Sequence, residues 1–429
     1  MTSRPKSAGL FYGWWMVAAA CGLQFMQAGL LQQSFGAYVA VLRDEFGWSK
    51  TALSGGAVIQ QVESAVLGPI LGWFVDRFGA RGMIRAGVVL FGAGFMLLSR
   101  MDSLLDFYAA FVLLALGSGT CGFFPLTVSL LNWFERKRAR ALSMMSLGYA
   151  MGGMAVPVVA WCLLTWGWRA TAFGSGVFII LVGLPLSSVI RSRPEDRGEL
   201  VDGVQPDPSP RAGSSPACEL RTRDFTVAEA LRAPAFWYVS LGHGSAMLLV
   251  SAVTVHAITH LKEGLGYGVG EAALVIGLMT LFQFAGMLLS GAIGDRFDKA
   301  RVSALCMLMH MSGLLLLTYA ASPVMVLGFA VLHGLAWGAR GPLMHAMRAD
   351  FFGRSSIGMI IGLSSLVVLV GQISGPFIAG VLADAAGHYR GGFTIIALLA
   401  GAGSVFFLLC RNAAPERFPA PVTASNAIR

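Results

Sequence analysis

Runs of about 20 or more apolar residues follow one another along nearly the whole 429-residue chain. A helix needs ~20 apolar residues to cross the hydrocarbon of a bilayer. Membrane β-strands alternate polar and apolar residues over ~10 positions, and these runs do not alternate. The runs therefore predict an all-α membrane protein with twelve spanning helices. Their approximate bounds are 12–40, 50–75, 82–99, 105–131, 139–165, 169–190, 234–260, 271–294, 301–320, 324–348, 356–384 and 391–411.

The composition excludes the main alternatives to a membrane protein. Hydrophobic residues make up 56% of the chain and charged residues only 12%, about half of the ~25% in an ordinary soluble domain. A disordered chain would need low hydrophobicity and high charge. The net charge of +9 is therefore interpreted as a bias of the loops, with the lipid bilayer and not nucleic acid as the large partner.

The basic residues predict the orientation in the membrane. With the N-terminus inside, 24 of the 31 Lys and Arg residues fall in inner segments, six fall in outer loops, and Arg340 falls within a span. Inner loops are enriched in Lys and Arg. Both termini and the segment 191–232 are therefore expected in the cytoplasm. The first apolar run is too long for the core of a signal peptide and is interpreted as an uncleaved helix.

The two halves of the chain repeat each other at an offset of 217 to 219 residues. Five pairs of segments carry the repeat: 72–77 with 291–296, 133–134 with 351–352, Pro125 with Pro342, Pro157 with Pro376, and 42–48 with 261–267. The repeat predicts two pseudo-symmetric six-helix bundles, residues 1–190 and 233–429, joined by a Pro- and Ser-rich cytoplasmic linker at 191–232. Repeated bundles bind substrates at their interface and alternate its access by rocking.

The segment Gly72–Arg81 resembles the signature that members of the major facilitator superfamily carry between helices two and three. Its matching residues are Gly72, Asp76, Arg77, Gly79 and Arg81. The second-half copy keeps Gly291, Asp295 and Arg296. Gly72 allows close helix approach, and Asp76 can pair with basic groups or cap a neighbouring helix. We interpret both copies as a conformational gate. The alternative is a solvated charged loop that satisfies the positive-inside rule.

A narrower resemblance is to the monocarboxylate porter family and its bacterial relatives. It rests on Tyr12–Trp15 at the start of the first helix and on 132–142, which leads into the fifth. The resemblance implies import or export of small carboxylates, often coupled to protons, across a bacterial cytoplasmic membrane by a monomeric functional unit. The chain departs from the animal members of this family in one respect. Those members carry an Asp/Arg pair inside helix eight, whereas the corresponding segment 271–294 has no interior charge and only Gln283 in its place.

Arg340 is the strongest candidate for a substrate-binding residue. Charged groups inside a membrane are costly and mark functional sites, and a guanidinium binds a carboxylate through two parallel hydrogen bonds. His333 lies two helical turns earlier, and Trp337 lies between them. A structural Arg340, bonded to backbone carbonyls or extended to the cytoplasmic surface, remains the alternative. For His333, substrate binding, proton coupling and a structural role all remain open.

Glu63 is the acidic residue nearest the middle of a span. A lone carboxyl group in a low dielectric binds protons near neutral pH, as proton coupling requires. A permanently protonated Glu63, hydrogen-bonded between helices, is the alternative. If Glu63 carries the proton, Glu63→Gln would abolish accumulation driven by a pH gradient and spare substrate exchange.

Other polar residues of the spans are weaker candidates. Gln24 and Gln27 share a face of the first helix, which lines the cavity in the family that the chain resembles. His256 and His260 have the spacing of a metal pair, but a role at the outer mouth is favoured because no third ligand is near in sequence. His243 and His310 are interpreted as structural, the latter because span nine is peripheral in that family.

These observations favour a secondary active transporter of a small organic anion, working by alternating access and coupled to protons. No Walker loop, nucleophile elbow or metal-ligand cluster is present, so we expect neither an enzyme nor a cofactor nor a metal site. A membrane-embedded sensor would need a folded signalling domain. A multidrug or other small-molecule exporter and an anion exchanger remain as alternatives within the same fold.

Overall fold

The computed structural model describes residues 11–48, 50–203 and 224–412, and these residues form helices and no strand. The first half contains α1 (Tyr12–Gln27), the π-turn η1 (Ala28–Gln32), α2 (Phe35–Phe46), α3 (Lys50–Phe78), α4 (Ala80–Leu98), α5 (Leu104–Cys121), α6 (Phe123–Trp133), α7 (Arg138–Gly152) and α8 (Val156–Val189). The second half contains α9 (Val227–Arg232), α10 (Pro234–Thr259), the π-turn η5 (His260–Gly264), α11 (Val269–Ile293), α12 (Lys299–Thr318), α13 (Pro323–Phe352), α14 (Ile357–Ala386) and α15 (Arg390–Asn412).

The predicted twelve crossings are present in the described residues. Ten continuous helical stretches are long and apolar enough to cross a membrane. One of them, Arg138–Val189, contains 52 residues and is broken at Gly167, whose φ of 78° and ψ of 162° are not helical. It therefore supplies two crossings. The 29 residues of α3 supply a further one.

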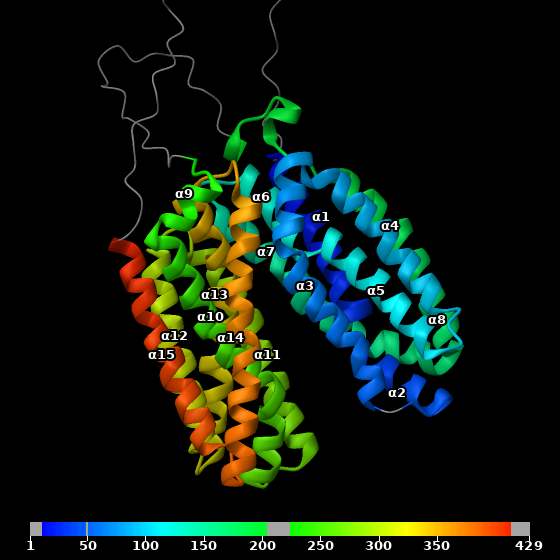
Figure 1. Cartoon of the computed structure of the whole chain (residues 1–429), viewed down its shortest axis with the longest axis vertical. Helices are drawn as coiled ribbons and strands as arrows, with labels where there is room; N and C mark the ends of the chain where they lie inside the picture. Colours follow the sequence, from blue (N-terminus) through cyan, green and yellow to red (C-terminus); the bar gives the residue numbers. More distant parts are fainter. Residues whose placement is uncertain (1–10, 49, 204–223, 413–429) are drawn as a thin grey trace, which may run out of the picture.

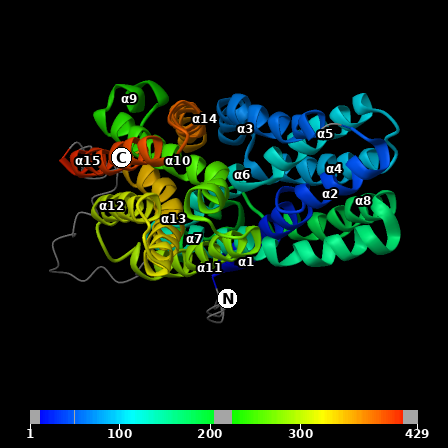
Figure 2. The same cartoon turned by 90° about the horizontal axis from the view of Figure 1, so that it is seen from below.

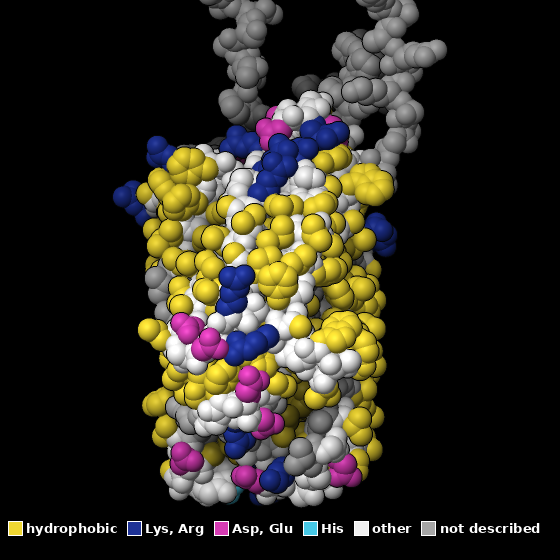
Figure 3. All heavy atoms as spheres, turned by 90° about the vertical axis from the view of Figure 1, so that its right-hand side faces the viewer, with side chains coloured by type: hydrophobic (Ala, Val, Ile, Leu, Met, Phe, Trp, Pro, Cys, Tyr) yellow, Lys and Arg dark blue, Asp and Glu magenta, His cyan; other side chains and the backbone are white. Residues whose placement is uncertain are grey.

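The surface of the molecule is suited to lipid. Hydrophobic side chains cover most of the middle of the face in Figure 3, whereas Lys and Arg gather at its upper end and charges of both signs at its lower end. Many large apolar side chains are exposed, such as Leu164 at 83% and Phe377 at 70%. An apolar belt of this extent would aggregate in water, so the surrounding medium is the hydrocarbon of the bilayer.

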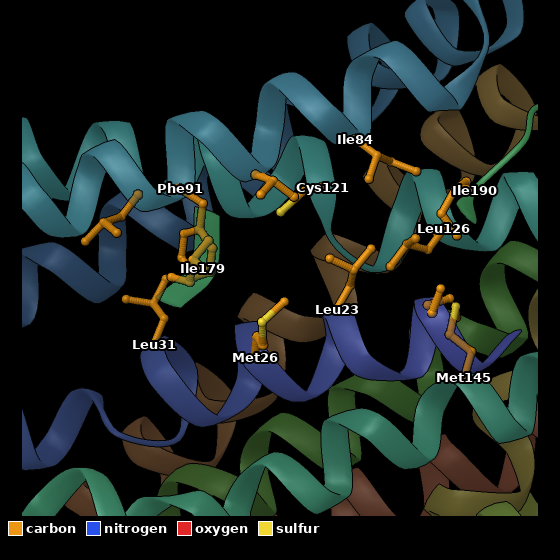
Figure 4. Packing of buried hydrophobic residues seen from close by; sticks show 14 of the residues in the cluster. Leu23, Met26, Leu31, Ile84, Phe91, Cys121, Leu126, Met145, Ile179 and Ile190 are labelled. Carbon is orange, nitrogen blue, oxygen red and sulfur yellow. The ribbon is translucent and has the colours of Figure 1, made fainter. Parts of the chain in front are cut away.

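The core consists of two main clusters, one for each half of the chain. Figure 4 shows part of the first cluster, where Leu23 and Met26 of α1 lie near side chains of neighbouring helices. The second cluster is built mainly from α10 to α15. A few residues cross between halves: Ala346, Ala349, Ile357 and Ile361 join the first cluster, and Ala139 joins the second.

The two halves meet near the end of the molecule that carries α6 and α9 (Figure 1). There α14 packs beside α3, and α11 packs beside α7, as the view along the long axis also shows (Figure 2). The two halves diverge toward the opposite end, where α2 and the start of α11 lie. The structure is therefore closed at the end that the sequence predicts to be cytoplasmic.

Candidate functional site

Asp76, at the last turn of α3, caps a helix of the other half. The backbone N–H of Gly358 donates to Asp76 Oδ1 at 3.0 Å, and that of Met359 donates to Oδ2 at 2.8 Å. These amides belong to the first turn of α14, where helical N–H groups have no partner within the helix. A carboxylate there also interacts favourably with the helix dipole. Of the two contacts expected for Asp76, the structure has the helix cap.

Asp295 makes the matching contact in the second half of the chain. The N–H groups of Ala139 and Arg140, in the first turn of α7, donate to its Oδ1 and Oδ2 at 2.8 and 3.0 Å. Burial raises the pKa of Asp295, and the hydrogen bonds from these two amides oppose that shift. Each copy of the repeat thus places a carboxylate on a helix of the opposite half.

Gly72 brings the two halves into backbone contact. A Cβ atom on Gly72 would lie 2.5 Å from the carbonyl oxygen of Gly358 and 2.9 Å from Cα of Met359. Gly68 and Gly362 meet one turn further along the same two helices. The helices α3 and α14 therefore cross through small residues, as closely packed membrane helices do. The equivalent contact of Gly291 is looser, with Ser143 Cβ at 3.3 Å.

The three arginines predicted for the gate lie differently. Arg77 is exposed and stacks over Trp73 and Phe78 of its own helix, with its guanidinium carbon 5.3 and 5.8 Å from the ring centroids. Arg296 is exposed. The backbone N–H of Arg81 donates to Ser192 Oγ at 3.5 Å, within the first half.

An ion cluster that was not predicted also joins the halves. Arg138 of α7 is 3% exposed and its Nη1 lies 2.6 Å from Asp350 Oδ1 of α13. The other carboxylate oxygen of Asp350 lies 2.8 Å from Lys299 Nζ. The same interface is extended by Arg354, whose Nη1 donates to the carbonyl of Asn132 at 2.7 Å. In the sequence, Asn132 and Arg138 belong to the segment 132–142, which carries the family resemblance, and no contact between the halves is predicted from them.

Arg340 is buried inside the second half and lacks a counter-ion there. Its side chain belongs to α13 and is 1% exposed. Nη2 lies 3.9 Å from the sulfur of Met247 in α10, and Nε and Nη1 have no hydrogen-bond partner. In the part of the chain that the structure describes, no carboxylate forms an ion pair with this guanidinium. The structure therefore does not contain the backbone-bonded Arg340 of the alternative interpretation.

Arg348 corrects the expectation that Arg340 is the one strongly cationic group within the spans. Arg348 is the last residue of the expected span 324–348 and counts among the inner basic residues, but α13 continues to Phe352 and Arg348 is 2% exposed within it. Its Nε and Nη2 donate to Ser364 Oγ at 3.0 and 2.6 Å, and its Nη1 donates to the carbonyl of Met344 at 3.1 Å. Nη2 also lies 3.2 Å from His243 Nδ1. Arg348 is thus satisfied by neutral acceptors, in contrast to Arg340.

His333 meets a histidine of the neighbouring helix α12. The Nδ1 atoms of His333 and His310 lie 3.2 Å apart, and both side chains are fully buried. Their rings are edge to face, with centroids 4.7 Å apart. Trp337 lies against the other side of His333, with ring centroids 6.0 Å apart. The structure therefore groups His333, Trp337 and Arg340 with His310, which the sequence analysis assigns to a peripheral structural role.

The remaining predicted site residues, Gln24, Gln27 and Glu63, belong to helices of the first half. Gln27 donates from Nε2 to the carbonyl of Ser118 at 3.1 Å, near the break between α5 and α6, and Gln24 Nε2 is buried without a partner. Gln24 and Gln27 directly precede the π-helical turn η1, and such turns within α-helices are frequent at functional sites. The side chain of Glu63 in α3 lies outside the described residues.

The outer histidine pair of the second half has protein partners. His256 Nδ1 lies 3.2 Å from the hydroxyl of Tyr389, and its Nε2 lies 3.0 Å from the carbonyl of Pro376. His260 Nε2 lies 3.1 Å from the carbonyl of Leu317. Among the described residues, no group of three His, Cys, Asp or Glu side chains is placed to hold a metal ion.

Twelve crossings, two repeated halves and carboxylates that cap helices of the opposite half define a membrane transporter built from two bundles. A family model described as Major Facilitator Superfamily matches residues 20–267 and 239–427. The chain belongs to this superfamily, whose members are transporters and not enzymes.

Relatives and solved structures agree with this assignment. Monocarboxylate transporter 13 of Bos taurus is 24% identical over 428 residues, covering 95% of this chain and 91% of the relative. The oxalate:formate antiporter of Oxalobacter formigenes is 23% identical, covering 81% of this chain and 80% of the antiporter. The proton:xylose symporter XylE superposes with a TM-score of 0.69 at 15% identity over 93% of this chain and 95% of XylE, which establishes the shared fold.

Proposed function

We propose that this protein is a secondary active transporter of a small organic anion, and that Arg340 binds the anion. The observation that carries the proposal is a buried guanidinium with two unpartnered nitrogens and no described carboxylate beside it. An unpaired charge in the interior of a membrane-spanning bundle costs several kcal/mol. A carboxylate that enters with the substrate would supply the missing charge and two hydrogen bonds. The relatives named for monocarboxylate and for oxalate and formate transport support the same chemical class.

Access to Arg340 requires a movement within the second half. Met247 Sδ lies against Nη2, and Arg340 is almost inaccessible in this conformation. Because a methionine side chain is flexible and unbranched, it can vacate this position at low cost. We propose that the anion arrives from the open end of the molecule and displaces the side chain of Met247.

Alternating access would use the contacts that close the opposite end. Asp76 and Asp295 would hold the bundles together there, and Gly72 would allow the close approach of α3 to α14. The arginines of the two motif copies, Arg77, Arg81 and Arg296, would keep the loops at the cytoplasmic surface. Release of the two helix caps would let the bundles rock and expose the site to the other side. One copy of the chain contains both halves of this gate, so we propose a monomeric functional unit.

The test of the substrate class is uptake by purified protein in liposomes. Radiolabelled formate, pyruvate, lactate and oxalate would be offered with and without an imposed pH gradient, beside xylose as a neutral probe and ethidium as a cationic one. We expect uptake of at least one of the four anions above that of protein-free liposomes, and accumulation when the outside is acidic. The anion that is transported then serves as the probe in every binding and exchange measurement, with pyruvate given as the example. Transport of xylose or ethidium without any of the anions would contradict the proposal.

The same assay separates proton symport from anion exchange. The name of the oxalate:formate antiporter makes exchange a specific alternative. An exchanger would take up label only when the liposomes are preloaded with an anion, whatever the pH gradient. A symporter would also fill empty liposomes when protons flow inward.

The orientation gives a separate prediction. If both termini and the 191–232 segment are cytoplasmic, as the basic residues predict, Pro210→Cys would react with a membrane-impermeant maleimide only after the cells are permeabilised. Ser322→Cys, which lies exposed at the start of α13, would react in intact cells and serves as the control. Labelling of position 210 in intact bacterial cells would contradict a cytoplasmic linker and the proposed placement in the cytoplasmic membrane.

A further inference from the structure

Two histidines from neighbouring helices form a pair in the interior of the second half. His310 of α12 and His333 of α13 are both fully buried, and their Nδ1 atoms lie 3.2 Å apart. Close helix packing produces the contact, because a Cβ atom on Gly313 would lie only 3.2 Å from the backbone nitrogen of His333. Phe329 and Trp337 lie beside the ring of His333 and limit the entry of water.

The geometry fixes how protons are distributed over this pair. Two neutral imidazoles can share an Nδ1···Nδ1 hydrogen bond only if one ring carries its hydrogen on Nδ1 and the other on Nε2. The donor ring is then left with a lone pair on Nε2, and the acceptor ring with an N–H on Nε2. Both Nε2 atoms are buried without a partner. The pair therefore holds one free proton acceptor and one free donor in the dry interior of the bundle.

Arg340 is the charged group that acts on this pair. It lies seven residues after His333 in α13, two turns along the same face of the helix, so its positive charge opposes an imidazolium on either ring. Cys306 of α12 also interacts with Arg340, and His243 of α10 interacts with Arg340 and Arg348. The other elements packed around the pair carry their charged residues at their ends: Glu271 at the start of α11, Asp384 near the end of α14, and Arg390 and Arg411 at the ends of α15.

We propose that the His310–His333 pair is the proton-binding site of the transporter and that Arg340 links proton binding to anion binding, an inference that rests on the proposed anion site. When a carboxylate neutralises Arg340, a proton from the same compartment adds to the free Nε2 lone pair and forms an imidazolium. When the anion leaves, the guanidinium repels the imidazolium, the same N–H bond breaks, and the proton passes to water of the compartment that the anion enters. One proton and one carboxylate charge then move together, so each cycle is electrically neutral for a monocarboxylate.

Thermodynamic linkage gives the inference a quantitative test. If the anion favours protonation of the pair, protonation favours the anion by the same factor. Pyruvate binding to the purified protein would be measured between pH 8 and pH 6, followed by pyruvate accumulation in liposomes. We expect the affinity of the wild type to rise about tenfold as the pH falls, within the usual range of coupling between sites. His310→Asn and His333→Asn would reduce this change to less than about twofold and would abolish accumulation, while pyruvate exchange between loaded compartments continues.

Two further variants separate the inference from its alternatives. His388→Asn removes a histidine outside the bundle interior, in the turn between α14 and α15, and would keep the wild-type pH dependence. Glu63→Gln tests the acidic candidate. If Glu63→Gln loses accumulation while both variants of the pair keep it, the proton site is Glu63 and the inference is wrong. If the wild type transports none of the four anions, the proposed function itself fails.

A measurement on the wild type does not depend on the folding of any variant. Nitrogen-15 NMR of the seven histidines would detect a coupling between the Nδ1 atoms of His310 and His333 across their hydrogen bond. Addition of pyruvate at pH 6 would convert one of the two rings to the imidazolium form. Absence of the coupling, or a pair that stays neutral with pyruvate bound, would overturn the inference.

Discussion

Replacement of Arg340 by alanine is expected to abolish anion transport while the protein stays folded in the membrane. The substitution removes the proposed partner of the carboxylate and leaves the anion unpaired at a buried site. Loss of one partner of a buried, hydrogen-bonded charge pair costs about 2–5 kcal/mol, which corresponds to a loss of about 30- to several-thousand-fold in affinity. Initial uptake of pyruvate into liposomes would therefore fall to the level of protein-free liposomes.

The lysine variant distinguishes a specific anion clamp from a general need for positive charge. Arg340→Lys keeps the charge but replaces the planar fork with a single ammonium group. We expect weak transport with a half-saturation concentration raised about tenfold, because one of two parallel hydrogen bonds is lost. Arg100→Ala, at an exposed position of the outer surface, is the matched control and should transport like the wild type. If both Arg340 variants fail to accumulate in the membrane, Arg340 has a structural role instead.

Replacement of Gly72 by leucine is expected to prevent closure of the end where α3 meets α14, which the basic residues predict to be cytoplasmic. The new Cβ atom would overlap the carbonyl of Gly358 at 2.5 Å, and the partner there is backbone, which cannot rotate away. The clash would push α14 away from α3 and remove the amides of Gly358 and Met359 from Asp76. The bundles could then reach the inward-open arrangement but not this one, and transport would fall by about two orders of magnitude, as expected for a barrier raised by ~3 kcal/mol.

The conformational effect of Gly72→Leu can be measured apart from transport. Spin labels or fluorophores placed at the end of α3 and at the start of α14 would report a longer distance in the variant than in the wild type. Gly82→Leu is the control, because a Cβ atom at Gly82 of α4 meets no other atom within 4 Å. Unchanged distances together with normal transport by Gly72→Leu would show that closure of α3 on α14 is not part of the cycle.

The fold could be predicted from the sequence because its determinants are local or repeated. A helix must satisfy its backbone within lipid, so each long apolar run predicts one crossing independently of its neighbours. The repeat then relates the two halves without any knowledge of their packing. The sequence also predicts two contacts for Asp76, an ion pair with a basic group or the cap of a neighbouring helix, and the second is present. The prediction is possible because a carboxylate at a helix end beside small residues has few other partners available.

The partners of the buried polar groups could not be predicted. Arg348 is the last residue of the expected span 324–348, and only the continuation of α13 to Phe352 places it in the interior beside Ser364. The sequence predicts a structural role for His310, because its helix is peripheral in the family that the chain resembles. In the structure its side chain points toward α13 and reaches His333. Such contacts depend on the rotation of each helix about its axis. Hydrophobic periodicity defines this rotation poorly when lipid and core are both apolar.

The asymmetry between the two halves has the same origin. The helix caps by Asp76 and Asp295 are nearly equivalent, as the repeat predicts. The histidine pair, Arg340 and Arg348 belong to the second half, and the first-half position that matches Arg340 is occupied by Phe123. The repeat thus supplies the contacts that join the two halves, and the residues outside the repeat supply the proposed chemistry.

Direct binding of pyruvate to the purified protein tests the central claim more directly than transport does, because it needs no conformational cycle. Equilibrium binding would be measured at pH 6 for the wild type, for Arg340→Ala and for Arg100→Ala, with each protein confirmed as folded and monodisperse. The account predicts saturable binding to the wild type and to Arg100→Ala, and an affinity at least about 30-fold lower for Arg340→Ala, as for other broken buried charge pairs. Equal binding of pyruvate by Arg340→Ala and the wild type would contradict it.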